Sequence, residues 1–215
     1  MQYQQYQFFV SFVTGLGGLC LFWIILYRAT QKHPWSLTMG EDNRPSTSKF
    51  QMLVWTSAVV FAYLAIYQIR FSQHHTEGLP AIPQNLLIAM GISAATTVSA
   101  KAIAVSSDKA AKSKAAAALL AGLPLPARKA SLSGIFQDDD GSPDLGKVQV
   151  VLWTLIAVGV FLSGVFVEMY SPNTCVVGKE CEMAIPDIGQ TLMILMGLGH
   201  GAYIGGKIAQ SQGGS

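Results

Sequence analysis

KFQMLVWT at residues 49–56 recurs as KVQVVLWT at residues 147–154, and each copy begins a long apolar run. Each copy is followed by an Ile-Pro pair, and then by a Met-Gly pair that leads to a lysine. Internal repetition of this kind predicts a duplicated structural unit, here two apolar helices joined by a turn. The matching residues are Lys49, Gln51, Trp55, Thr56, Ile82, Pro83, Met90, Gly91 and Lys101 in the first copy, and Lys147, Gln149, Trp153, Thr154, Ile185, Pro186, Met196, Gly197 and Lys207 in the second.

The composition indicates a membrane protein. Of 215 residues, 51% are hydrophobic and 12% are charged, a balance typical of chains that lie largely in a bilayer. Crossing the hydrocarbon layer takes about 20 residues of apolar helix. We therefore predict an all-α integral membrane protein with five transmembrane helices, one N-terminal helix followed by two parallel tandem two-helix hairpins. The predicted helices cover residues 8–27, 51–69, 86–105, 148–167 and 188–206.

Turn-forming residues and charges divide the chain into segments. A hydroxyl within Pro45-Ser46-Thr47-Ser48 is expected to cap the first helix of the first hairpin, and the carboxylate of Asp144 that of the second. Each Ile-Pro pair is expected at the start of the second helix, where proline loses no hydrogen bond. The expected segments are an N-terminal transmembrane helix (1–30), a cytoplasmic connector (31–48), the first hairpin (49–105), a cytoplasmic helix extension and linker (106–146), the second hairpin (147–209) and a flexible tail (210–215).

The distribution of basic residues predicts the orientation. With the N-terminus outside and the C-terminus in the cytoplasm, only Arg70 and Lys179 of the 14 lysines and arginines fall outside. This is the asymmetry of the positive-inside rule. The first helix lacks a basic start and a cleavage pattern, so we do not expect a secretory signal.

The cysteines suggest one disulfide. Cys175 and Cys181 lie in the long outer loop, where an oxidising compartment favours a bond between them. The alternative is two free thiols. Cys20 is expected to be a buried thiol, and two cysteines alone make a poor zinc site, so no metal is predicted.

Small residues recur every four positions on the second helix of each hairpin. This spacing places them on one helical face and lets two backbones approach closely in lipid. We expect this face to pack against another helix, and the alternative is that it lines a pore. The two sets are Gly91, Ala95 and Ser99, and Gly197, Gly201 and Gly205.

Polar residues inside the predicted helices need partners. His200 is an ionisable group in the last helix, which by default suggests a function such as pore lining or pH sensing. An interhelical hydrogen bond is the interpretation we favour. Gln51 and Gln149, with Thr56 and Thr154, are expected to pair across the two hairpins.

The boundary residues of the repeat fit the inner membrane surface. Lys49, Lys101, Lys147 and Lys207 are expected to reach lipid phosphates. Trp55 and Trp153 fit the inner aromatic belt, or alternatively wedge between the hairpins.

Several function classes lack support. The predicted membrane cores contain no Asp, Glu, Lys or Arg, the groups on which pumps and proton relays depend. The sequence has no nucleotide-binding, zinc or nucleophile motif, and its basic residues form no patch with aromatics. We therefore expect no enzyme activity, no cofactor and no nucleic-acid partner.

The doubled Lys-x-Gln-x-x-x-Trp-Thr and Met-Gly-Ile/Leu…Lys unit resembles a loose group of small multi-pass bacterial membrane proteins without a settled function. The likeness covers residues 49–101 and 147–207. It implies a bacterial inner membrane and no activity. We expect a homo-oligomeric anchor or an accessory subunit of a membrane complex, in contact with the bilayer. The alternative is a small passive channel lined by the glycine-rich helices.

Overall fold

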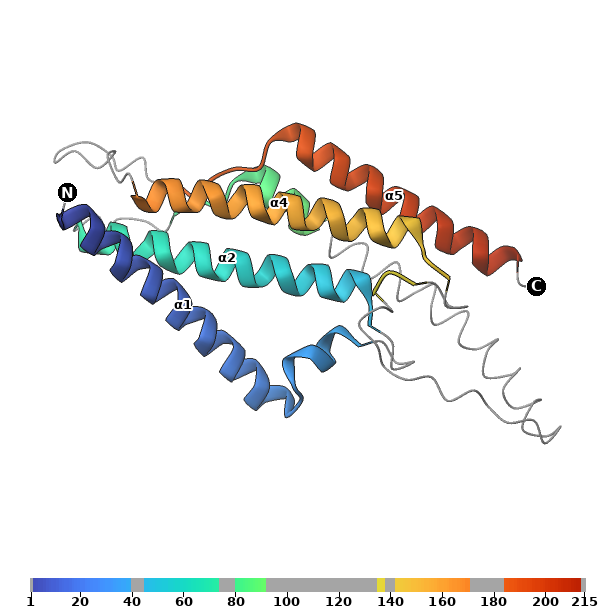
Figure 1. Cartoon of the computed structure of the whole chain (residues 1–215), viewed down its shortest axis with the longest axis horizontal. Helices are drawn as coiled ribbons and strands as arrows, with labels where there is room; N and C mark the ends of the chain where they lie inside the picture. The colour runs from blue at the N-terminus through green and yellow to red at the C-terminus, as the bar shows by residue number, and fades with distance from the viewer. Residues whose placement is uncertain are drawn as a thin grey trace.

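The computed structural model describes residues 2–39, 45–73, 80–91, 135–137, 142–170 and 184–213 (Figure 1). Regular structure in this part is helical, which confirms the predicted all-α class. The elements in chain order are α1 (Gln2–Thr30), the 3-10 helix η1 (Pro34–Thr38), α2 (Thr47–Ser72), α4 (Leu145–Tyr170) and α5 (Gln190–Gly213), and residues 84–91 are also helical.

Three helices are long and apolar enough to cross a membrane: Gln4–Thr30, Thr47–Ser72 and Leu145–Tyr170. They contain three of the five predicted spans. α5 is not among them, because its glycines, His200 and Lys207 interrupt the apolar run. The predicted span at 86–105 is described only as far as residue 91.

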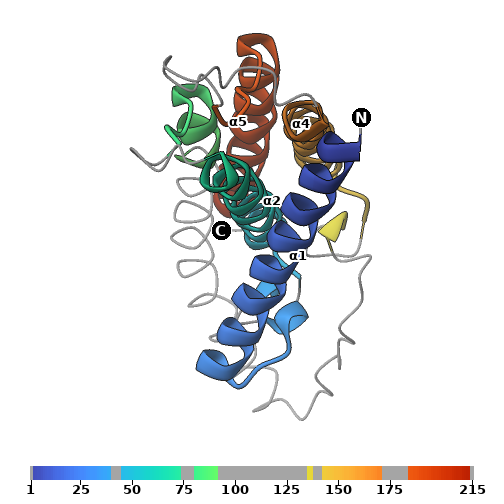
Figure 2. The same ribbon diagram turned by 90° about the vertical axis from the view of Figure 1, so that its left-hand side faces the viewer.

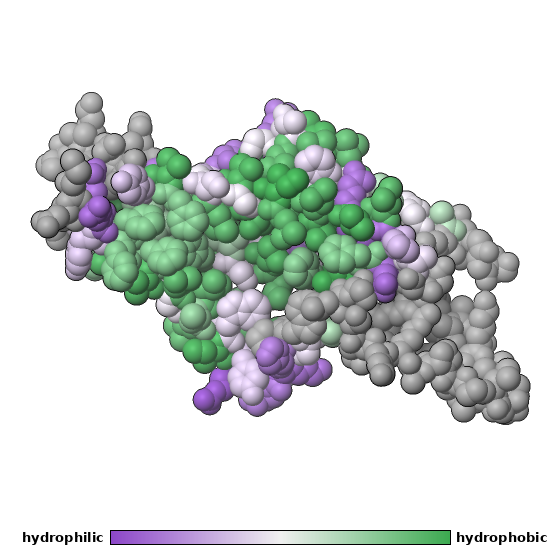
Figure 3. Space-filling model, viewed as in Figure 1, coloured by the Kyte–Doolittle hydropathy of each residue, from purple (hydrophilic) through white to green (hydrophobic). Residues whose placement is uncertain are grey.

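The outer surface of these helices is apolar. Figure 3 shows a band of hydrophobic residues over the middle of the helices, with hydrophilic residues mostly toward the ends. On α1, Phe9 is 64% exposed and Ile25 is 58% exposed. Soluble proteins rarely leave so large a continuous apolar surface in water, so the helices are compatible with a protein that contacts lipid.

α2 packs against both α1 and α4, and the start of α1 also lies beside α4 (Figure 2). α1 runs antiparallel to α2, because the Gln7 amide near its start donates to the Ser72 hydroxyl at the end of α2 over 3.1 Å. Glycines allow the two helices to cross closely. A Cβ atom on Gly15 would lie 2.8 Å from the Phe61 ring, and one on Gly18 would overlap the Leu64 side chain.

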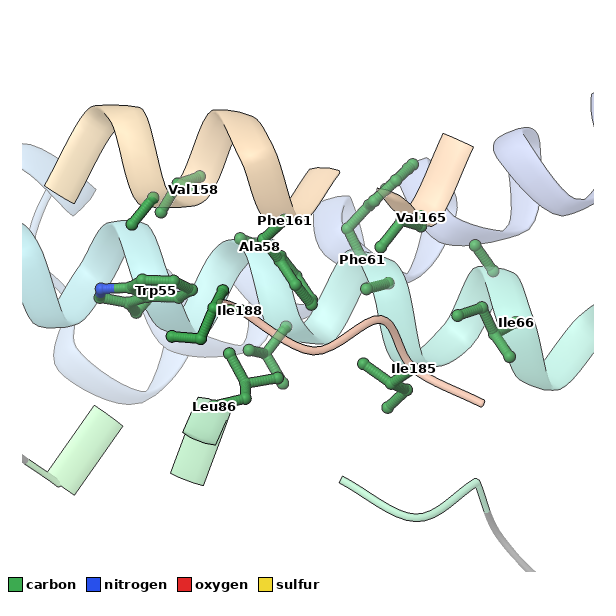
Figure 4. Close-up of a cluster of buried hydrophobic side chains, with 14 of the residues drawn as sticks. Trp55, Ala58, Phe61, Ile66, Leu86, Val158, Phe161, Val165, Ile185 and Ile188 are labelled. Atoms are coloured by element: carbon green, nitrogen blue, oxygen red, sulfur yellow. The ribbon is translucent and has the colours of Figure 1, made fainter. Parts of the chain in front are cut away.

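α2 and α4, the first helices of the two repeats, lie side by side and run parallel. The rings of Trp55 and Phe161 are 6.1 Å apart, and those of Phe61 and Phe166 are 6.0 Å apart further along both helices. Figure 4 shows the buried cluster between them. Trp55 and Phe161 are each 1% exposed, so large side chains fill the centre of this pair.

The loop before α2 is closed by backbone and side-chain contacts. Met39 and Pro45 form an isolated β-bridge, and the Ser46 amide donates to the Thr38 carbonyl over 2.7 Å. The Lys49 ammonium donates to the Met39 carbonyl over 2.7 Å. Ser46 makes no side-chain capping hydrogen bond, so that expected cap is wrong.

The loop before α4 repeats these contacts at equivalent positions. Gln137 bridges to Pro143, the Asp144 amide donates to the Phe136 carbonyl over 2.8 Å, and the Lys147 ammonium donates to the Gln137 carbonyl. The Asp144 carboxylate also accepts from the Gly146 and Lys147 amides, which confirms it as a cap. The structural repeat therefore begins about one loop earlier than the sequence predicted.

These contacts correct the role expected for two of the boundary lysines. The ammonium groups of Lys49 and Lys147 hold carbonyls of their own loops instead of extending to phosphates, and Lys147 is only 7% exposed. Lys101 and the Lys207 side chain lie outside the described part.

In each repeat a segment without regular secondary structure precedes the next helix, at residues 80–83 and 184–189, and we call these the extended segments. α5 starts at Gln190 instead of residue 188, and it continues to Gly213, beyond the expected start of the tail. Ile185 and Ile188 are buried against α2, between the levels of Trp55 and Ile66 (Figure 4). A Cβ atom on Gly164 would lie 2.9 Å from Pro186, so this extended segment also presses on α4. Pro186 is thus four residues ahead of the helix, and its expected place at the helix start is wrong.

Candidate functional site

His200 joins α5 to α2 through a buried hydrogen bond. Its Nε2 lies 2.8 Å from Oε1 of Gln51, and its Nδ1 lies 2.5 Å from the Met196 carbonyl one turn earlier. His200 is 3% exposed and Gln51 is 0% exposed. This is the interhelical hydrogen bond that we favoured for His200, and in the described part the imidazole faces no open space.

The polar groups around this bond are not fully satisfied. Nε2 of Gln51 and Nε1 of Trp55 are buried donors without a partner, and Trp55 is one turn from Gln51 on the same face of α2. Figure 4 shows the indole nitrogen at the end of the ring nearer the start of α2. A neutral imidazole carries one N–H, whereas both ring nitrogens of His200 face oxygens. A protonated ring donates to both oxygens. A neutral ring donates from Nδ1 to the Met196 carbonyl, and its Nε2 accepts from the Gln51 amide if the oxygen and nitrogen of that amide exchange places.

The predicted pairing of the repeat glutamines is wrong. Gln149 is exposed on α4, whereas Gln51 is buried against His200. The hydroxyls of Thr56 and Thr154 bond carbonyls of their own helices, those of Met52 and Val150, at 2.8 and 2.7 Å. The two glutamines therefore differ in burial: Gln51 is enclosed and bonded to His200, whereas Gln149 stays exposed although its Cγ lies 3.8 Å from where a Cβ atom on Gly199 of α5 would be.

The two tryptophans also differ. Trp55 is buried between the helices of the two repeats, as the wedge alternative predicted. Trp153 is half-buried beside α5, where a Cβ atom on Gly199 would lie 3.7 Å from its ring.

The small-residue ladder does not make the close packing that we expected within the described part of the chain. A Cβ atom on Gly91, Gly197, Gly201 or Gly205 would meet nothing within 4 Å. Ala95 and Ser99 lie outside the described residues. Close backbone approach occurs instead at Gly15 and Gly18 of α1 and at Gly164 of α4, which the spacing argument did not select.

A second polar contact joins the helix at residues 84–91 to the segment at residues 184–189. The Asn85 amide donates to Oδ2 of Asp187 over 2.8 Å and to the Ile188 carbonyl over 3.3 Å. Oδ1 of Asp187 accepts from the Ile188 amide over 2.9 Å. Asn85 belongs to the first hairpin and Asp187 to the second, so this clasp connects the repeats.

Sequence reasoning missed this clasp because it treated Asp187 only as the last residue of a loop and assigned no role to Asn85. The signal available was the repeated Ile-Pro pair, which marks a break before each second helix.

The cysteines divide between the described part and the rest. Cys20 is free and exposed on α1, so the expectation that it is buried is wrong. Cys175 and Cys181 lie outside the described residues, and their disulfide stays a prediction. Within the described ranges, no three His, Cys, Asp or Glu residues converge as metal ligands.

Comparison with protein-family models, with curated proteins and with solved structures gave no match. The resemblance to small bacterial membrane proteins therefore stays a prediction from the motif.

Proposed function

We propose that this chain is a polytopic membrane protein whose two hairpins, together with α1, make five membrane segments with the N-terminus outside and the C-terminus in the cytoplasm of a bacterial cell. The exposed apolar surface of α1 and α4 supports this placement. The doubled inner loops also support it, because they give both repeats the same entry side. α5 then enters from an extended segment and is shorter within the bilayer than α2 and α4.

The proposed role is non-enzymatic: an oligomeric anchor or accessory subunit of a membrane complex. The observation that carries this role is the open small-residue face of α5. Gly197, Gly201 and Gly205 meet no described neighbour, and Leu198 beside them is 63% exposed. Small residues in a membrane helix favour contact with another helix. A further protein helix, from a second copy or a partner, fits this face.

A passive channel is the second candidate, and the same open face supports it. Trp55 and Phe161 fill the space between α2 and α4, so a pore through that pair is blocked. Any pore would lie between copies, along the glycine face of α5.

Two measurements on the full chain separate these roles. For an anchor, proteoliposomes stay tight to ions and small solutes, and native mass in lipid nanodiscs shows an oligomer or a complex. Deletion of residues 123–134, which keeps the contacts of Ile135, Gln137 and Asp144, releases a cytoplasmic partner. For a channel, the liposomes leak and Gly201→Leu stops the leak, while Gly17→Leu on α1, where an added Cβ meets nothing, does not. Tight liposomes with a monomeric, partner-free protein would contradict both roles.

A further inference from the structure

The hydrogen bonds of His200 depend on the charge of its ring. Nε2 lies 2.8 Å from Oε1 of Gln51, and Nδ1 lies 2.5 Å from the Met196 carbonyl. With the Gln51 amide in this orientation, only a protonated imidazole donates to both oxygens, because a neutral ring carries one N–H. A neutral ring needs the amide reversed, so that the amide nitrogen donates to Nε2. The orientation of the Gln51 amide is therefore coupled to the protonation of His200.

The orientation that suits a protonated ring leaves two buried donors without acceptors. Nε2 of Gln51 and Nε1 of Trp55 have no hydrogen-bond partner, although the two side chains are 0% and 1% exposed. They lie one turn apart on the same face of α2, and the indole nitrogen is at the end of the ring nearer the start of the helix (Figure 4). Buried donors are nearly always satisfied, so this pair indicates an acceptor from outside the described residues. Reversal of the amide replaces one donor by an oxygen, so the need for that acceptor is greatest in the protonated state.

A protonated His200 also needs a negative partner that the described part of the chain does not supply. The described charged or titratable side chains at this end of the surrounding helices are Lys49 on α2, Asp144 and Lys147 at the start of α4, and Tyr203 on α5. The two lysines add positive charge, and the Asp144 carboxylate accepts from the amides of residues 146 and 147 in its own helix. A buried cation is costly without an anion beside it. Together with the two free donors, this charge favours a small anion over a neutral acceptor such as water.

We propose that Gln51, Trp55 and His200 bind one small monovalent anion, such as chloride, together with a proton on the His200 ring. The anion accepts from Nε2 of Gln51 and Nε1 of Trp55, and it neutralises the imidazolium. When the ring loses its proton, the amide reverses, one donor is withdrawn and the anion leaves. Because linked equilibria are reciprocal, the anion in turn favours uptake of the proton. Gln51 lies about 6 Å along the helix from Thr47 at the start of α2, so both ions enter from that end of the protein.

Trp55 itself reports the anion, because bromide quenches indole fluorescence on contact. In the full chain in detergent micelles, Phe replaces Trp23, Trp35 and Trp153, so that Trp55 is the only indole. At low pH we expect quenching that saturates with bromide and is reversed by chloride, with gluconate keeping the ionic strength constant. Once His200 is mostly neutral, each further pH unit should weaken the apparent binding about tenfold, because the form that binds becomes ten times rarer.

The second repeat supplies a matched control. Gln149 and Trp153 have the same spacing on α4, but Gln149 is exposed, so a chain that keeps only Trp153 should show quenching proportional to bromide at every pH. In the chain that keeps only Trp55, His200→Gln retains a side chain that can bond Gln51 but takes up no proton, and it should abolish the saturation. Gel filtration and circular dichroism confirm the fold of each variant. Proportional quenching of Trp55 at low pH, which is also the result expected if water satisfies the two donors, would overturn the anion site. Saturation that persists unchanged at high pH or in His200→Gln would overturn the role of His200.

Discussion

At the crossing of α1 and α2, we predict opposite effects on stability for alanine substitutions at two glycines that are two residues apart. A Cβ atom added at Gly15 would lie 2.8 Å from the Phe61 ring and 3.1 Å from the Phe61 carbonyl oxygen. The ring can rotate away, but the carbonyl belongs to the hydrogen-bonded backbone of α2. At Gly17 the added Cβ meets nothing within 4 Å. Gly15→Ala therefore forces the helices apart, whereas Gly17→Ala does not.

The magnitudes follow from two known effects. Overpacking a close contact costs about 1–3 kcal/mol. Replacing glycine by alanine in a helix returns about 0.5–1 kcal/mol, because the unfolded chain loses less entropy. Gly15→Ala should thus destabilise the protein by up to about 2.5 kcal/mol, the difference of these effects. Gly17→Ala should be neutral or stabilising by up to about 1 kcal/mol.

Unfolding in mixed detergent micelles, followed by tryptophan fluorescence, measures the two free energies. Gly18→Ala provides a second test of the same crossing, since its added Cβ would overlap the Leu64 side chain. Because Leu64 is flexible, its cost should be below that of Gly15→Ala. Equal shifts for Gly15→Ala and Gly17→Ala would refute the close crossing.

Three further predictions concern the other contacts. His200→Ala leaves the buried Gln51 oxygen without a partner and should lower the free energy of unfolding by about 1–3 kcal/mol. Gln149→Ala, on the exposed surface of α4, should change this free energy little. Equal effects of the two variants in the same unfolding assay would contradict the His200–Gln51 bond. Gly201→Leu should leave the unfolding of monomers unchanged but shift native mass in nanodiscs toward smaller assemblies, and an unchanged distribution would remove the open face as an oligomer contact. In a background without native cysteines, a cysteine at Gln73 should react with an impermeant thiol reagent applied outside intact cells and one at Ser142 should not, so equal labelling would contradict the proposed orientation.

The duplicated sequence predicted the parallel pair at the centre of the protein but not the contacts that hold it. Lys49 and Lys147 recur at the same position, and the sequence predicted that both reach lipid phosphates. It could not show that each ammonium binds a carbonyl ten residues earlier in the chain. That carbonyl is brought near the lysine by the β-bridges at Pro45 and Pro143, which the sequence pattern did not predict. A basic residue beside an apolar run is compatible with either partner.

The sequence predicted that the loop ends at Asp187 and that the helix starts at residue 188, two residues before α5. It did not predict that Ile185 and Ile188 are buried against other helices, because an apolar residue beside a proline does not show what it packs against. Pro186 fits a helix start equally well. What decides is the contact of Pro186 with Gly164, a residue on another helix. The predicted close packing of the small-residue ladder was wrong for a similar reason. The spacing of Gly197 and Gly201 identifies a helical face of small residues, but it does not show which element packs against that face.

The polar contacts between hairpins are made where the two repeats differ. Gln51 of the first repeat bonds His200 of the second, while the sequence equivalents, Gln149 and Ala94, offer no such pair. When the two Ile-Pro pairs are aligned, Asn85 corresponds to Ile188 and Asp187 corresponds to Gln84. The equivalent residues therefore do not form a second Asn–Asp contact. Two identical hairpins would carry each polar group twice, and the unused copy would face lipid at a cost. At Gln149 the unused copy is retained and exposed, whereas His200, Asn85 and Asp187 have no polar copy of the same kind in the other repeat. Each repeat therefore supplies one side of these two polar contacts, while the apolar framework is shared.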